Sequence, residues 1–187
     1  MIVSAFALLV AGVSGASGTS ATPAADAAAV AFLCPPGTER AGAEPPDGFE
    51  VACERPDRPA ERRRDGPART YYDDGGLAKE AWFKEGKPHG AFTEWHRNGR
   101  VARAGAWEDG VRAGAWRLYY ESGQLEEECS YDGRGERHGR FTTYWPGGKR
   151  KAEGRFCHGL QCGKWTSWDE RGREVGRVAY EEIRGEP

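Results

Sequence analysis

Cysteine is the residue type in this chain whose spacing points most directly to chemistry. Cys157 and Cys162 flank four residues, and a hairpin loop of that length brings its flanking residues close enough for a disulfide. Cys34 and Cys53 stand 19 positions apart among turn residues and predict a second disulfide, which closes a small lobe. Cys129 occupies a position that is Ala or Gly elsewhere in the repeat described below, so a buried free thiol is expected there.

Histidines and carboxylates do not point to a further site. His89 and His138 occupy the same place two repeat copies apart, roughly 20 Å at about 4.8 Å per strand, which is too far to share a metal ion. His158 lies between two cysteines, but zinc needs four ligands and no others are near in the sequence. The run Glu126–Glu128 would stay solvated on an open sheet, and no serine-nucleophile motif is present. We therefore expect no catalytic residue, no metal and no cofactor.

Charge and composition exclude further classes of protein. The 187 residues include 27 basic and 29 acidic side chains, a net charge of −2. This balance lacks the Lys/Arg excess of a nucleic-acid-binding surface. Large aliphatic residues are scarce, whereas seven Trp, seven Tyr and seven Phe are present, and most of them follow Gly66. An aromatic core in the last two thirds of the chain is expected.

The N-terminal third differs from the rest and carries an export signal. An apolar run over residues 2–13 precedes small residues and is too short to span a membrane, although no Lys or Arg stands before it. Pro-rich and charge-rich stretches follow, which are typical of linkers. The predicted organisation is a signal peptide (1–17), an Ala/Pro-rich linker (18–33), a small disulfide-closed segment (34–53), a charged linker (54–65), a repeat region (66–180) and a C-terminal tail (181–187).

A repeat of 24 or 25 residues is the strongest pattern in the chain. Its defining glycines are Gly66, Gly90, Gly114, Gly139 and Gly163. Aromatic residues recur two, five and seventeen positions after this glycine, as in Trp116, Tyr119 and Tyr131. The self-similarity indicates five tandem copies, at 66–89, 90–113, 114–138, 139–162 and 163–180.

Each copy reads as two short strands separated by glycine turns. Asn98-Gly99 and Asp109-Gly110 are typical turn dipeptides, and glycines at this frequency would break helices. The aromatic positions two and five after the repeat glycine are three apart, so they should point to opposite faces of a sheet unless a bulge intervenes. The predicted fold is all-β: an elongated, single-layer antiparallel β-meander of tandem hairpins, preceded by a disordered N-terminal extension.

The pattern from Gly90 to Gly99, followed by Gly105 to Gly110, resembles the MORN-repeat variant of bacterial proteins. The resemblance covers about residues 65–180, although the first copy has Ala68 where an aromatic residue is expected. It implies an elongated antiparallel sheet of hairpins. Many proteins with this variant are labelled antitoxin-like, and eukaryotic relatives are scaffolds or lipid-associated.

The expected function is non-catalytic binding of another protein by an exported chain. Tyr and Trp dominate binding hot spots. The candidate partner-binding residues are therefore Tyr72, Trp95, His96, Tyr120, Trp145 and Trp168, although these side chains could simply stabilise the sheet. The alternatives are an antitoxin or immunity-type protein and a membrane-lipid-associated protein, the latter disfavoured by the near-neutral charge. No nucleic-acid partner is expected, and the oligomeric state stays open.

Overall fold

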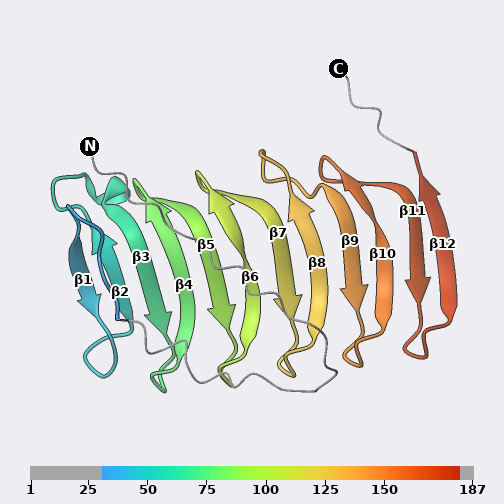
Figure 1. Ribbon diagram of the computed structural model, residues 1–187, viewed down its shortest axis with the longest axis horizontal. Helices are drawn as coiled ribbons and strands as arrows, with labels where there is room; N and C mark the ends of the chain where they lie inside the picture. The colour runs from blue at the N-terminus through green and yellow to red at the C-terminus, as the bar shows by residue number, and fades with distance from the viewer. Residues whose placement is uncertain (1–30, 182–187) are drawn as a thin grey trace, which may run out of the picture.

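The computed structural model describes residues 31–181, and these form one twelve-stranded antiparallel sheet in which spatial order follows sequence order (Figure 1). The strands are β1 (Glu39–Ala43), β2 (Glu50–Glu54), β3 (Arg64–Tyr71), β4 (Leu77–Lys84), β5 (Lys87–Trp95), β6 (Val101–Glu108), β7 (Val111–Tyr119), β8 (Leu125–Tyr131), β9 (Gly139–Tyr144), β10 (Arg150–Cys157), β11 (Leu160–Trp168) and β12 (Glu174–Tyr180). The predicted all-β, single-layer meander is confirmed. The predicted signal peptide and the N-terminal disorder lie outside the described residues.

The sheet begins earlier than the repeats do. The hairpin β1–β2 pairs with β3, with Ala52 opposite Ala68, so the disulfide-closed segment is part of the sheet and not a separate lobe. The disulfide between Cys34 and Cys53 is present and ties the incoming chain to β2. The segment 54–65, expected to be a linker, starts at the end of β2, contains the short 3-10 helix η1 (Ala60–Arg62) and enters β3. No helix among residues 31–181 is long and apolar enough to cross a membrane.

The five repeat-defining glycines share one backbone conformation. All have positive φ, from 63° at Gly114 to 114° at Gly66. Around Gly114 the register shifts, because three residues of β7 lie opposite the single residue Gly105 of β6. The same shift occurs around Gly163 in β11. Each repeat glycine thus belongs to a β-bulge, and a residue with a Cβ would be strained there.

One face of the sheet, the aromatic face, holds the core. Trp116 is 1% exposed and forms a cluster with Cys129, Phe141 and Phe156. Trp116 also lies against Trp107, with ring centroids 5.4 Å apart and planes at 89°. Such edge-to-face pairs add stabilisation beyond their buried area. A single sheet can therefore be stable without a second layer, because rings of neighbouring strands bury one another.

Small residues make room for the large rings on this face. Trp116 packs over Gly105, and Trp165 packs over Gly154, so that a Cβ at either glycine would overlap the indole. Each indole Nε1 also donates a hydrogen bond to the preceding hairpin strand, to Ala106 O in the first case at 3.0 Å. The buried free thiol predicted at Cys129 is confirmed, and burial raises its pKa.

Candidate functional site

The opposite face of the sheet, the polar face, carries a row of charged and hydroxyl side chains. Register pairs place one residue of each strand from β3 to β12 in this row: Arg69, Glu80, Thr93, Ala104, Arg117, Glu128, Thr142, Glu153, Thr166 and Arg177. Ion pairs join Arg69 to Glu80 at 2.5 Å and Arg117 to Glu128 at 2.9 Å. Each of these two cations therefore lies opposite an anion, with the uncharged Thr93 and Ala104 between the pairs, and this part of the row is locally neutral.

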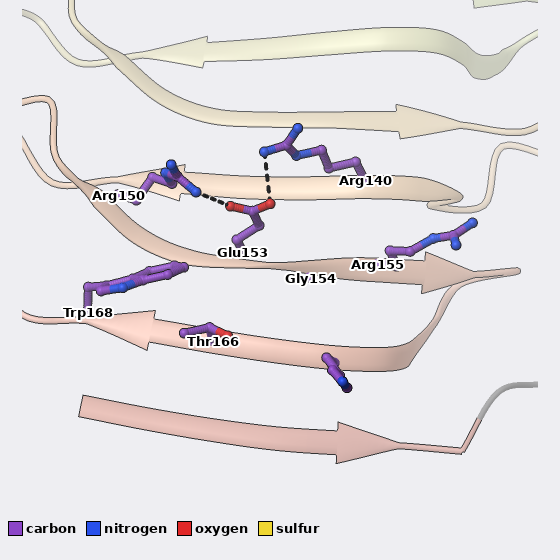
Figure 2. A pocket seen from close by; sticks show the side chains of 8 residues that line it. Arg140, Arg150, Glu153, Gly154, Arg155, Thr166 and Trp168 are labelled. Carbon is purple, nitrogen blue, oxygen red and sulfur yellow. Dashed lines mark hydrogen bonds and ion pairs between the residues drawn. The ribbon is translucent and has the colours of Figure 1, made fainter. Parts of the chain in front are cut away.

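The C-terminal end of the polar face has a different charge balance. A shallow hollow over β9, β10 and β11 is lined by Arg140, Arg150, Glu153, Gly154, Arg155, Lys164, Thr166 and Trp168 (Figure 2). Four cationic side chains and one carboxylate thus line the hollow. The excess of cations in the hollow consequently favours an anion there.

The single carboxylate of the hollow is already shared between two arginines. Glu153 accepts from Arg140 at 2.8 Å and from Arg150 at 2.6 Å, as the dashed lines in Figure 2 show. Arg155 and Lys164 make no ion pair within residues 31–181. Two cations of the hollow therefore remain available to a bound anion.

Strand register places two like charges opposite each other in this hollow. Arg140 of β9 and Arg155 of β10 are direct cross-strand partners. Like charges in that position destabilise a sheet, and a carboxylate from outside the chain would relieve the repulsion. Trp168 forms one wall and lies 5.6 Å from the guanidinium of Arg150, which provides an apolar surface next to the charge.

Four of the six predicted partner-binding residues serve the sheet itself. Each reaches the main-chain carbonyl of the next copy with its polar tip: Tyr72 to Trp95 at 2.6 Å, His96 to Tyr119 at 2.8 Å, Tyr120 to Tyr144 at 2.7 Å, and Trp145 to Trp168 at 3.0 Å. These residues, the inter-repeat fasteners, are all half-buried. Of the remaining two, Trp168 lines the hollow and Trp95 is half-buried at the end of β5.

The sequence reasoning overlooked the cations of the hollow. Arg140, Arg155 and Lys164 each directly follow a glycine of the repeat, which places them on the polar face by alternation. A count of cations at these positions in successive copies could have found them. Ala91 and Ala115 occupy the places of Arg140 and Lys164 in earlier copies.

A cluster of Asp132, His138 and His158 was also missed. Their ligand atoms all lie within 4.8 Å of one another at the turns between β8 and β9 and between β10 and β11. His138 and His89 share a repeat position two copies apart, but the structure places His138 beside His158, in the turn between β10 and β11. The disulfide predicted between Cys157 and Cys162 is present and brackets His158.

Comparison with known proteins agrees with the repeat geometry. The family model described as MORN repeat variant matches residues 64–85, 112–132 and 137–158. These stretches correspond to the strand pairs β3–β4, β7–β8 and β9–β10. No match was found among curated proteins. With repeat copies matched between residues 64 and 158 and the same hairpin geometry continuing to β12, the chain belongs to the MORN repeat variant family.

Proposed function

We propose that this MORN-repeat protein is an exported, non-catalytic module that binds an acidic segment of another protein in the cationic hollow of its polar face. The observation that carries the proposal is the cross-strand pair Arg140–Arg155 within a hollow of four cations and one carboxylate. Arginine binds carboxylates through two parallel hydrogen bonds, and Trp168 supplies the aromatic anchor that protein interfaces favour.

Export is supported by the disulfide pattern. Both disulfides close local loops, whereas disulfides are rare in reducing compartments. The non-catalytic assignment is supported by the surroundings of the carboxylates. Glu80, Glu128 and Glu153 on the polar face are each paired with an arginine on an open sheet surface, which differs from the enclosed surroundings that tune a general acid.

The proposal is tested with a defined acidic probe. A fluorescent ten-residue oligo-glutamate is titrated with the protein, and binding is followed by fluorescence anisotropy at several salt concentrations. Reversing both available cations, Arg155→Glu with Lys164→Glu, should weaken binding at least tenfold, equivalent to about 1.4 kcal/mol. The fold should survive, because a glutamate at position 155 would face Arg140 as an opposite charge.

A matched control carries the same change of charge elsewhere. Arg134→Glu with Arg171→Glu alters two exposed turn residues outside the hollow and should leave binding unchanged. Equal loss in both double variants would mean that only net charge matters, and the hollow would be rejected as the site. Photo-crosslinking from position 155 in the exported fraction then identifies the partner. A toxin among the products would make the protein an antitoxin, whereas binding to anionic vesicles without any crosslinked protein would replace the protein partner by a membrane.

A further inference from the structure

We propose that Asp132, His138 and His158 form a binding site for a divalent transition-metal ion of the Zn²⁺ type, here called the turn site. Asp132 directly follows β8, His138 directly precedes β9, and His158 lies in the turn between β10 and β11. Three ligand atoms of two imidazoles and one carboxylate lie within 4.8 Å of one another. Two nitrogens and one oxygen are a ligand set that zinc uses in open sites, where water takes the fourth position.

The spacing of the ligand atoms fits a metal ion between them. Two ligands of a tetrahedral zinc ion, each about 2.1 Å from the metal, are about 3.4 Å apart. His158 Nδ1 and Asp132 Oδ2 are 3.2 Å apart, close to that separation. The rings of His138 and His158 have centroids 4.8 Å apart, so a small rotation of exposed His138 completes the set. The ion would insert without a shift of the backbone.

The carboxylate ligand is already oriented. Asp132 Oδ1 accepts backbone hydrogen bonds from Arg134 at 2.9 Å and from Glu136 at 3.0 Å, which leaves Oδ2 directed at His158. Hydrogen bonds of this kind fix ligand orientation in metal sites and raise affinity. The side chain of Asp132 is 17% exposed, so it does not have to be ordered on binding.

The two turns that carry the ligands are fastened to each other. The amide of Gly159 donates to Arg137 O at 2.9 Å, and the amide of His138 donates to Ser130 O at 2.8 Å. The disulfide Cys157–Cys162 closes the turn around His158. The backbones of all three ligands are therefore held before any ion binds, which lowers the entropy cost of binding.

The chain contains a natural counterpart that lacks the third ligand. His89 and Asp109 occupy the places of His138 and His158 two copies earlier in the array, with Nδ1 and Oδ1 3.3 Å apart. The residue that corresponds to Asp132 there is Lys84, a cation. This place has two ligand side chains and a repelling charge, and it should not bind the metal. It therefore serves as a matched control within the same molecule.

The test uses the full chain with a tag that contains no histidine and with both disulfides intact. Zn²⁺ is titrated by isothermal calorimetry, and Co²⁺ is used separately to report tetrahedral coordination by visible absorption. We expect one equivalent of Zn²⁺ per chain. His138→Ala and His158→Ala should each weaken binding at least tenfold, and Asp132→Asn should abolish the Co²⁺ spectrum, whereas His89→Ala should leave both unchanged.

One further variant and one further measurement guard the interpretation. Cys129→Ser excludes the free thiol as a ligand and should bind Zn²⁺ as the unchanged chain does. Far-UV circular dichroism confirms that each variant retains its sheet. No saturable binding by the unchanged chain, or equal loss of binding in His89→Ala and His138→Ala, would overturn the turn site. Neither result would affect the cationic hollow, because no residue of the turn site lines it.

Discussion

Gly154→Ala tests the packing of the aromatic face most sharply. A Cβ added at Gly154 would lie 2.1 Å from Cδ2 and 2.3 Å from Cε2 of Trp165, far inside van der Waals contact. The indole cannot rotate away freely, because Nε1 donates to Arg155 O at 3.1 Å and Phe156 packs edge-on at 5.2 Å. The φ of Gly154 is not positive, so alanine meets no backbone strain there. The substitution therefore isolates a steric clash.

The expected cost follows from two opposing effects. Overpacking a rigid site costs about 1–3 kcal/mol of stability. Because the added Cβ overlaps ring atoms, we expect the clash to cost about 3 kcal/mol. Where alanine fits, the same change would instead stabilise by about 0.4–1 kcal/mol through the unfolded chain. In a Trp165→Ala background the ring is gone, so Gly154→Ala should change from destabilising to slightly stabilising. The predicted coupling energy between the two positions is about 3 kcal/mol.

The assay is urea unfolding followed by far-UV circular dichroism, with all four members of the double-mutant cycle measured under non-reducing conditions. Gly147→Ala is the matched control, since a Cβ there meets no atom within 4 Å and its φ is not positive. It should shift stability by less than about 0.5 kcal/mol. If Gly154→Ala costs the same with and without the Trp165 ring, the small–large packing argument for this face is wrong.

Three other perturbations have defined outcomes. Tyr120→Phe should lower the free energy of unfolding by about 1 kcal/mol in urea, because the carbonyl of Tyr144 loses its donor. Replacing Cys34 and Cys53 by serine should cost about 3 kcal/mol, from the chain entropy of the opened loop. Burial raises the pKa of Tyr71 from 10.0 to about 12, so the stability from its neutral phenol is complete below pH 10 and lost as the pH rises to 12. Tyr71→Phe should remove that part of the alkaline decline, and an unchanged pH profile of unfolding would contradict the assignment.

The repeat architecture could be predicted because its special backbone conformations require particular residue types. A glycine at every repeat start corresponds to a positive φ in a bulge, as at Gly90 and Gly163. The three-residue spacing between Trp165 and Trp168 places them on opposite faces, the first on the aromatic face and the second in the hollow. Period-two alternation settles this without any tertiary information.

The attachment of β1–β2 and the turn site could not be predicted from the sequence, because both depend on tertiary contacts that the repeat pattern does not indicate. Residues 39–54 lack the aromatic and glycine columns, yet they pair with β3 through ordinary ladder bonds. His138 precedes β9, and His158 lies 20 residues later in the turn between β10 and β11. Only the register of β9 against β10 brings these two turns together. A pattern that compares equal positions of different copies cannot reveal a contact between unequal positions.

The inter-repeat fasteners show that one column of the predicted partner-binding residues has a structural role. Tyr72, His96, Tyr120 and Trp145 share an O–H or N–H at the far end of a flat side chain, and each uses it on a carbonyl of the following copy. Phenylalanine is as aromatic but has no donor, and it does not occur in this column. The fifth copy has Asp169 at this position, and β12 is the last strand of the described residues. The column therefore requires a side chain that is long enough to reach the next copy and that carries a donor, and it links neighbouring copies.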